Sequence, residues 1–547
     1  MIQENDIIKF AEHDFHGGIH PEQHKRLSSQ TNSEVLPLAN ELLLPFDATA
    51  HSSTSVKQNQ KINIGDKIRF GQTLTAGPST NSGNENENKN RTITHSPFDA
   101  EVVDISEQNL GHPSGLIALS IRIKRIEQGT EKPILRPISN WQSETTRSLL
   151  SRIEEASIVG LGGAVFPTHI KLNVAKLNIN TLIINAMECE PYITCDHRLI
   201  IENADEIIEG ALITAKIVDA HNILIGIEDN KSEAILSLEH SIRKLNLLEK
   251  PKIKIVIAST KYPSGGEKQL IQILTGQEVP NGSYPASLGI IVQNPATLFS
   301  VTKAIVEGLP LTKRLVTITG NACGKPGNYW IPFGTSIKHI SKHLKINLET
   351  TSEIVFGGPL MGELIEDSNV PTNKSTNCII FNNSERALDN DTGIKLSLSS
   401  NSHLACIRCG ECESVCPASL VPQQLYWFAK NEQWAELEQH SLFDCIDCGA
   451  CNYVCPSEIP LVSYYRYAKS QIESNKIKLA ISDTAKQRFE NRDIRLNRLK
   501  WERQEKKRET VAARKKSAIK KLDDPEGKKT AIQDALARVK KKKENIT

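Results

Sequence analysis

The chain has 547 residues, of which 39% are hydrophobic and 24% are charged, and its formal net charge is +2. This length is too great for one hydrophobic core, so we expect about three to five soluble globular domains. The balanced charge argues against a nucleic acid as a partner of the whole chain. No stretch approaches the ~18 to 20 consecutive apolar residues of a membrane span, and Met1–Phe10 lacks the pattern of a secretory signal. We therefore expect a cytosolic chain with reduced thiols.

The N-terminal segment, residues 1–45, is predicted to be rich in turns, because it carries the run FHGGIHPEQHK from Phe15 to Lys25. Residues 46–130 are predicted to form an all-β domain with glycine turns between short apolar runs, such as IGDKI and FGQTL. Within that domain, Pro78–Arg91 is polar and of low complexity, which predicts a mobile loop.

Residues 135–305 alternate between strand and helix patterns. Short apolar runs rich in β-branched residues cover Thr181–Ala186, Ile223–Ile227 and Lys252–Ala258, and helical periodicity is clearest in Arg198–Ala220. This alternation predicts an α/β domain built on a largely parallel sheet. After it, residues 306–390 return to short strands with glycine turns such as VFGGPLMG.

A glycine-rich loop opens the candidate binding site of the α/β domain. Gly160, Gly162 and Gly163 precede a helix-like stretch that carries Lys171. Glycines let a backbone curl so that successive N–H groups point at an anion, although a plain tight turn is the commoner outcome of such a run. The loop does not match the dinucleotide-binding pattern G-x-G-x-x-G, because Val165 occupies the sixth position.

Further polar residues follow the predicted strands. The first strand carries Asn185 and runs into Glu188 and Glu190, and two later turns carry Glu267 and Asn294. Function often sits at the carboxyl end of a strand in an open α/β sheet, which strengthens these residues as site candidates. The alternative for each acid is a solvated or ion-paired surface residue.

Eight of the twelve cysteines lie in two copies of the spacing C-x2-C-x2-C-x3-C-P. Three cysteines in one tight loop can hold three irons of a cubane cluster, and the fourth, before proline, reaches the other cluster in two-cluster ferredoxins. The spacing therefore predicts two [4Fe–4S] clusters, which transfer single electrons, with crossed ligands. The first set is Cys406, Cys409, Cys412 and Cys455, and the second set is Cys416, Cys445, Cys448 and Cys451.

A pair of zinc sites is the alternative for these cysteines. Zinc usually takes two ligands from each of two separated C-x2-C knuckles, which three closely spaced cysteines fit poorly. The other four cysteines have no ligand spacing and are expected to be packing residues; they are Cys189, Cys195, Cys323 and Cys378.

The C-terminal tail is predicted to be a long charged helix, broken near Asp523–Gly527 and followed by a lysine-rich end. Its apolar face is thin and its charges alternate in sign. We therefore favour a solvated helix close to a partner or a membrane over direct insertion into lipid.

The motifs GLGGAVFPT, NAMECEP, YPSGGEK and the Asn294 turn, in this order, resemble the flavin-bearing, NADH-oxidising subunit of respiratory complex I. With FHGGIHP before them and the cysteine runs and basic tail after them, the chain resembles the RnfC (RsxC) family over residues 10–500. Members of that family are the peripheral RnfC subunits of the Rnf ion-translocating oxidoreductase complex.

The resemblance implies a multidomain protein of α/β plus β class. The implied domains are a lipoyl-like β-sandwich (46–130), a Rossmann-like flavin and NADH domain (135–305), a β-grasp, SLBB-like domain (306–390), a two-cluster ferredoxin module (395–472) and a charged helical tail (473–547). Ala100 stands where the lipoyl-like turn normally carries glycine, and no lipoylation lysine is evident, so that domain is expected to serve docking or structure.

The resemblance also implies an enzyme, an ion-translocating oxidoreductase (translocase) that acts as part of a complex. It implies electron transfer between NAD(H) and ferredoxin or another carrier, through non-covalent FMN and the two clusters, coupled to ion translocation across the inner membrane. The chain would sit peripherally on the cytoplasmic side, with integral-membrane and other subunits as partners.

By resemblance, the candidates for the flavin and nucleotide site are Gly160, Gly162, Gly163, Lys171, Asn185, Glu188, Glu190, Glu267 and Asn294. The glycine amides and Lys171 suit a phosphate, the two asparagines suit the polar edges of a flavin, and the acids suit ribose hydroxyls. No catalytic residue is singled out. Two other functions stay open: a soluble flavin and iron–sulfur reductase of the cobalamin-reductase type, and a non-catalytic scaffold that keeps the clusters without the flavin.

Overall fold

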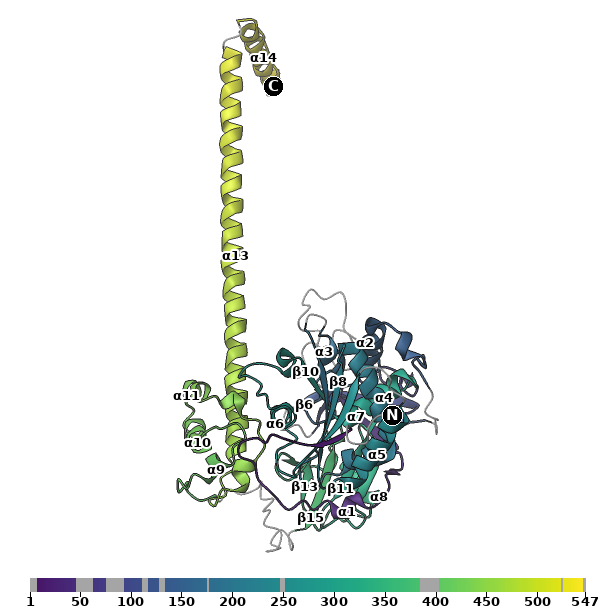
Figure 1. Cartoon of the computed structure of the whole chain (residues 1–547). Coiled ribbons are helices and arrows are strands. Elements are labelled where there is room, and N and C mark those ends of the chain that lie inside the picture. The colour runs from purple at the N-terminus through teal and green to yellow at the C-terminus, as the bar shows by residue number, and fades with distance from the viewer. Residues whose placement is uncertain are drawn as a thin grey trace. The chain divides into compact units, whose positions relative to one another are not determined.

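The computed structural model describes residues 7–45, 62–74, 93–110, 117–126, 133–174, 177–245, 251–383, 403–522 and 525–544 (Figure 1). The chain divides into two units, Met1–Arg466 and Tyr467–Thr547. The first unit contains three β-sheets and the cysteine-rich module, and the second is helical. The predicted loop Pro78–Arg91 lies outside the described residues.

Five strands form the central sheet of the first unit. In spatial order they are β1 (Ile8–Phe10), β9 (Lys252–Ala258), β8 (Asn222–Glu228), β7 (Thr181–Ala186) and β10 (Ile290–Gln293). Every neighbouring pair runs parallel. Strands β7, β8 and β9 contain the β-branched runs recognised in the sequence, which suit a sheet covered on both faces. The predicted parallel α/β arrangement is confirmed.

Helices cover both faces of this sheet. They are α2 (Thr146–Glu155), α3 (Thr168–Leu172), α4 (Cys195–Val218), α5 (Ser232–Lys244), α6 (Glu267–Thr275) and α7 (Pro295–Ile305). Leu182 and Ile184 of β7 share a core with α4, α5 and α7, whereas Ile183 shares a core with α6 on the other side of the strands (Figure 1). This alternation along β7 follows from the two-residue repeat of a strand.

The connections of the central sheet create a switch point. The chain runs outward from β7 through β8 to β9 and then returns to place β10 on the other side of β7. In open α/β sheets, ligands bind beyond the carboxyl ends of the strands where the direction of winding reverses. The carboxyl ends of β7 and β10 are therefore the expected place for a ligand.

A second sheet has six strands of mixed direction in the order β14–β13–β15–β11–β12–β2. The strands from the region after the α/β domain are β11 (Lys313–Thr319), β12 (Gly327–Pro332), β13 (Thr351–Phe356), β14 (Glu363–Leu364) and β15 (Cys378–Asn383). Helix α8 (Ile337–His343), which the strand pattern did not predict, packs its Ile337 and Ile340 on this sheet. The assignment of these elements to a β-grasp domain stays a prediction.

A third sheet is antiparallel, in the order β3–β6–β5–β4. Its predicted strands are β4 (Lys67–Ile68), β5 (Ala100–Asn109) and β6 (Ile117–Arg125). Ala100 is fully buried at the start of β5, so its small side chain is part of the hydrophobic core. The predicted all-β character is confirmed for the described residues, and the lipoyl-like label stays a prediction.

The N-terminal segment contributes one strand to each of the three sheets, which the sequence analysis did not foresee. Strand β1 pairs with β9, β2 (Glu34–Val35) pairs with β12, and β3 (Glu41–Pro45) pairs with β6. Helix α1 (Arg26–Ser29) lies between β1 and β2 in the sequence. The segment thus ties the three sheets of the first unit together.

The cysteine-rich module repeats its backbone as well as its cysteines. Its helices are α9 (Glu411–Ser414), α10 (Pro422–Lys430), α11 (Trp434–Gln439) and α12 (Ala450–Tyr453). Gly410 and Gly449 both adopt positive φ before α9 and α12, and Arg408 and Asp447 adopt positive φ at the matching positions of the two runs. A short 3-10 helix covers Leu442–Asp444 between α11 and α12, and two others elsewhere in the first unit cover Trp141–Ser143 and Pro285–Leu288.

The tail is helical, as predicted. Helix α13 covers Leu461–Leu522 and α14 covers Pro525–Glu544, so the two helices meet near the expected break. Apolar side chains such as Phe489, Ile494 and Trp501 are exposed along α13. Among the described residues, none of the helices is both long and apolar enough to cross a membrane.

Candidate functional site

The glycine loop presents a row of free backbone amides. The N–H of Gly160 donates to Phe166 O (2.9 Å), and that of Leu161 donates to Thr297 Oγ1 (2.9 Å). The next three amides, of residues 162–164, are exposed and have no acceptor among the described residues. Gly163 has a φ of +117°, and a Cβ placed on it would meet nothing within 4 Å. Successive free amides on a left-handed turn form a concave site for an anion such as a phosphate.

The loop lies at the switch point of the central sheet. A Cβ on Gly162 would stand 3.4 Å from Cβ of Asn294, which follows β10. Asn294 caps α7 by accepting from the Ala296 N–H (2.8 Å) and donates through Nδ2 to the Asp196 carboxylate. The Asp196 N–H donates in turn to Glu188 Oε1 (2.6 Å). Gly162, Asn294, Asp196 and Glu188, which come from three different connections, therefore lie in a row at the carboxyl ends of β7 and β10.

Three further candidates form a second group beside α6. Lys171 Nζ lies 2.7 Å from Glu267 Oε1 in a half-exposed ion pair, and Asn185 Nδ2 donates to Gly265 O (2.8 Å). Glu267 thus matches the ion-paired alternative that the sequence left open. The pair keeps the Lys171 ammonium group on the same side of the site as the YPSGGEK turn.

Glu188 and Glu190 point into the protein and are held by backbone amides. Glu188 accepts from the first N–H groups of α4, and Glu190 Oε1 accepts from Leu360 N (2.8 Å) and Met361 N (3.0 Å). Burial raises the pKa of Glu188 to about 7 and raises the pKa of Glu190. These contacts favour a role in shaping the loop after β7, and binding of ribose hydroxyls stays a prediction for both residues.

Two buried lysines stabilise this loop, and the sequence analysis did not single them out. Lys25 Nζ donates to the carbonyls of Glu188 (2.5 Å), Glu190 (2.8 Å) and Ile193 (2.8 Å). Lys231 Nζ lies 3.0 Å from Glu228 Oε2 and 3.8 Å from Glu188 Oε2, with both carboxylates buried. Lys25 is part of the FHGGIHPEQHK run, whose turn-forming residues gave no sign of a buried cation.

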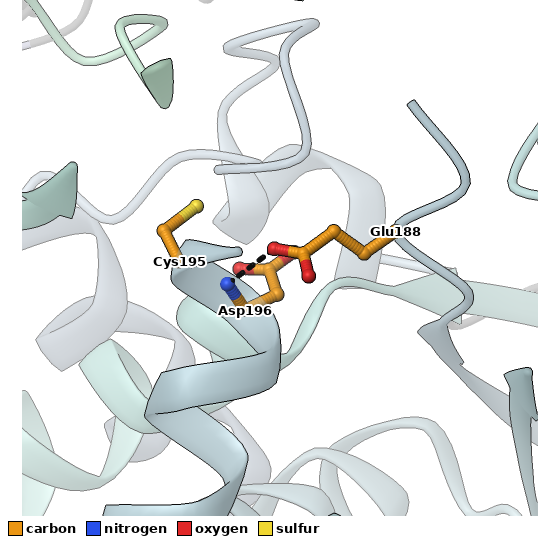
Figure 2. Close-up of side chains that lie close together, drawn as sticks. All are labelled: Glu188, Cys195 and Asp196. Atoms are coloured by element: carbon orange, nitrogen blue, oxygen red, sulfur yellow. Dashed lines mark hydrogen bonds between the residues drawn. The ribbon is translucent and has the colours of Figure 1, made fainter. Parts of the chain in front are cut away.

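Glu188, Cys195 and Asp196 bring their donor atoms within 4.8 Å of one another (Figure 2). Two of the three already have partners, because Glu188 accepts backbone N–H groups and Asp196 accepts from Asn294. The Arg314 guanidinium beside Cys195 and Asp196 opposes the rise that burial causes in both pKa values. Arg314 thus supplies the positive charge that a metal ion would otherwise supply. Glu188, Cys195 and Asp196 are therefore better explained as part of the loop structure than as a metal site.

The eight cysteines of the two runs line two separate cavities. The first cavity contains Cys406, Cys409, Cys412 and Cys455, and the second contains Cys416, Cys445, Cys448 and Cys451. Each set therefore takes its fourth cysteine from the other run, in the grouping that the sequence predicted. Proline, aliphatic side chains and one tyrosine, Tyr465, line the second cavity. The first cavity has a similar set with Tyr426, and Arg408, Gln423 and Ser457 in addition.

The chemistry of the second cavity fits a [4Fe–4S] cluster. Burial raises the pKa of Cys448 to about 12 and raises that of Cys451 well above its usual range. None of the residues that line this cavity is a cation. Thiolates in such surroundings need positive charge bound directly to sulfur, which the irons of a cluster supply.

The second cysteine set lies against the α/β domain. The buried Tyr262 donates its hydroxyl hydrogen to Cys448 O, and Gly18 N donates to Val415 O (2.9 Å). A small apolar cluster joins Ile19, Cys189 and Tyr262 to Cys448. In the first set, by contrast, Cys409 is exposed and Ile407 is 68% exposed. The module therefore has an inner cysteine set and an outer one.

The other four cysteines are buried, as expected of packing residues. Cys189 and Cys195 nevertheless belong to the loop and helix that form the candidate site. Cys189 Sγ accepts from the Gly265 N–H (3.2 Å), which links the loop after β7 to the YPSGGEK turn.

Comparison with known proteins gives three family models that match this chain. They are the Nuo51 FMN-binding domain (residues 153–303), the 4Fe-4S dicluster domain (402–459) and the RnfC barrel sandwich hybrid domain (13–126). The first of these models covers the glycine loop and the switch point, and the second covers both cysteine sets.

Similar curated proteins include the C subunit of the ion-translocating oxidoreductase complex of Serratia proteamaculans (strain 568). It is 40% identical over 97% of this chain and 70% of its own length. The protein of the same name from Pectobacterium carotovorum subsp. carotovorum (strain PC1) is 39% identical over 98% of this chain and 66% of its own length. Among solved structures, an NAD+-reducing [NiFe]-hydrogenase in the H2-reduced state matches 60% of this chain and 65% of its own, with 18% identity and a TM-score of 0.45.

Proposed function

The chain belongs to the RnfC family, the C subunits of ion-translocating oxidoreductase complexes, and from that premise we propose that it carries electrons between NAD(H) and other subunits of such a complex. Electrons would pass through a flavin and two [4Fe–4S] clusters. One observation carries the proposal. Eight thiols gather in two cavities, and the backbone carbonyl of Cys448 in the inner cavity accepts a hydrogen bond from Tyr262, whose loop lies beside the candidate flavin site.

The residues at the switch point are suited to hold FMN. The free amides of residues 162–164 provide an anion site for its phosphate, and the helix that follows the loop carries the Lys171 ammonium group, which is paired with Glu267. Asn294 and Asn185 offer amide groups at the carboxyl ends of β10 and β7. Bound FMN would supply the chemistry that accepts a hydride from NADH and releases single electrons.

The residues around the bound groups have separate tasks in this proposal. Lys25 and Glu188 fix the loop after β7, so that Asn185 and its neighbours keep one arrangement. The apolar walls of the inner cysteine cavity exclude water from its thiolates, which influences the reduction potential of a bound cluster. Two clusters together can hold both electrons of one hydride.

We further propose the finer features that the family resemblance implies. The partners would be integral-membrane and other subunits of an Rnf-type complex, with ferredoxin or another carrier as the second redox partner. The chain would associate peripherally with the cytoplasmic side of the inner membrane, and electron transfer would be coupled to ion translocation there. No residue of the described chain is assigned to ion movement.

Cofactor analysis of the anaerobically purified full-length chain tests the proposal. We expect about eight irons, as two [4Fe–4S] clusters require, together with one FMN and bleaching of the cluster absorbance by NADH. About eight irons with neither flavin nor NADH-dependent bleaching would instead identify a non-catalytic scaffold.

A second experiment separates a subunit of a membrane complex from a soluble reductase of the cobalamin-reductase type. Membranes are prepared from cells that express the chain with and without the neighbouring membrane subunits, and they are washed at moderate salt. Retention of the chain only when those subunits are present supports the proposal. Full NADH-dependent turnover by a soluble monomer would refute it.

A further inference from the structure

Tyr262 occupies the junction between the α/β domain and the inner cysteine set. Its side chain is 1% exposed, and its hydroxyl group donates to the backbone carbonyl of Cys448, a ligand candidate of that set. Its own backbone pairs with Ile19 through two hydrogen bonds (2.8 and 2.9 Å). The N-terminal segment thus fixes the tyrosine backbone while the ring extends to the cysteine loop.

The same tyrosine is connected to the candidate flavin site. Its loop continues to Gly265, which accepts from Asn185 Nδ2 (2.8 Å) and donates to Cys189 Sγ (3.2 Å). The loop after β7 and the inner cysteine loop are therefore connected through Tyr262 and the turn that follows it.

A buried tyrosine that lines the inner cavity provides a comparison. Tyr465 is also 1% exposed and donates its hydroxyl hydrogen to Pro422 O (2.6 Å). Pro422 begins α10 within the cysteine-rich module, so this bond does not reach the α/β domain. Both phenols donate to the backbone of a residue that lines the inner cavity, but of the two only Tyr262 belongs to a loop that contacts the candidate flavin site.

We propose that Tyr262 is a positioning residue that holds the Cys448 loop against the α/β domain and tunes the inner cluster for electron exchange with the flavin site. This inference rests on the proposed function. It implies that electrons from the flavin site enter at the cluster of the inner set. They would leave from the cluster of the outer set, whose Cys409 is exposed. A hydrogen-bond donor beside a cluster loop favours the reduced, more negative state.

The test is Tyr262→Phe in the full-length chain, purified anaerobically with its clusters. Phenylalanine keeps the ring and removes only the donor. We expect unchanged iron and FMN content and full reduction of both clusters by dithionite. The reduction potential of the inner cluster should shift to a lower value in an EPR-monitored titration, and its pre-steady-state reduction by NADH should slow several-fold.

Tyr329→Phe is the matched control, because Tyr329 of β12 is also buried (3% exposed) and donates its hydroxyl hydrogen to a backbone carbonyl, that of Lys325 (2.9 Å). We expect it to leave the rate of NADH-driven reduction at the wild-type value. If both variants slow this rate equally, or if Tyr262→Phe leaves both potential and rate unchanged, the proposal is overturned. If Tyr262→Phe loses the inner cluster, retention of that cluster in Tyr465→Phe supports the holding role, and equal loss refutes it.

The two proposals fail in different ways. A wild-type chain that dithionite reduces but NADH does not would sink the proposed function. The difference in inner-cluster potential between wild type and Tyr262→Phe can still be measured in that case, and its presence or absence decides the role of Tyr262.

Discussion

At the scale of single residues, Lys25 shows how one buried cation can order a loop. Its ammonium group donates to three carbonyls within the six residues Glu188–Ile193, and it lies among the carboxylates of Glu188 and Glu228. A buried carbonyl that loses its donor keeps the cost of its dehydration. The loop therefore depends on a residue that lies far earlier in the chain.

Lys25→Met should lower the free energy of unfolding by about 3 kcal/mol, because it leaves three carbonyls and a buried carboxylate without their cation. Urea unfolding would measure this loss, and the FMN content should fall with it. Lys325→Met is the control: Lys325 is 60% exposed in its ion pair with Glu34, so the cost should stay below about 1 kcal/mol. Equal losses in the two variants would contradict the role of Lys25.

Glu188 should make the stability depend on pH. Burial raises its pKa in the folded chain to about 7, whereas the unfolded value is about 4.3. Folding therefore favours the protonated form, and this stabilisation is complete below the unfolded pKa and lost as the pH rises through about 7. In urea titrations, wild type should lose stability relative to Glu188→Gln between about pH 5 and 8. A difference that does not change with pH would refute this prediction.

At the scale of structural elements, the two cysteine runs exchange their last members. Cys416 belongs to the first run but lines the cavity of the second, and Cys455 does the reverse. Each run is followed by proline, which turns the chain away from its own loop. The exchange makes the two runs dependent on each other for a complete set of four cysteines in each cavity.

Paired substitutions can test the exchange. Cys416→Ser should perturb the EPR signal of the inner cluster, and Cys455→Ser that of the outer cluster, each with little effect on the other signal. Loss of the outer signal in Cys416→Ser, with the inner signal intact, would show that each run binds its own cluster.

Gly17 allows the N-terminal segment to approach the cysteine-rich module. Its φ is +69°, and a Cβ there would stand 2.7 Å from the backbone of Val415. Gly17→Ala should therefore cost about 2–3 kcal/mol, from overpacking and backbone strain together. Gly65 has a φ of +91° and open space around it, so Gly65→Ala should cost only about 1 kcal/mol. Thermal unfolding of both variants separates the cost of overpacking from the cost of the positive φ. Similar losses of stability in the two variants would contradict the close contact between Gly17 and Val415.

Much of this architecture could be predicted because its signals are local. The cysteine spacing, the β-branched strands and the glycine loop are each contained within a few consecutive residues. The buried lysines had no such signal: Lys25 and Lys231 lie in polar stretches, and their burial comes from contacts between distant segments. Strand β1 is only three residues long, so its pairing with β9 depends on the tertiary structure rather than on its own pattern.

At the scale of the whole molecule, the tail is expected to govern association rather than electron transfer. Helices α13 and α14 carry dense charge and scattered exposed apolar side chains, which suits contact with a partner or with anionic headgroups. A chain that ends at Lys476 should keep its iron, FMN and bleaching by NADH but should be released from washed membranes at lower salt than the full chain. Loss of the clusters on truncation would contradict this division of roles.

The placing of strands β1, β2 and β3 in three different sheets has a consequence for synthesis on the ribosome. Strand β1 emerges first, yet its partner β9 follows roughly 250 residues later, which at ~5–20 residues per second is a delay of about 10–50 seconds. Strand β2 waits longer still for β12. Strand β3 is followed by its partner β6 far sooner, but β1 and β2 have no pairing partner during this time, and such edges invite association with other chains. We therefore expect the newly made chain to depend on chaperones until its N-terminal segment closes over sheets that were made after it.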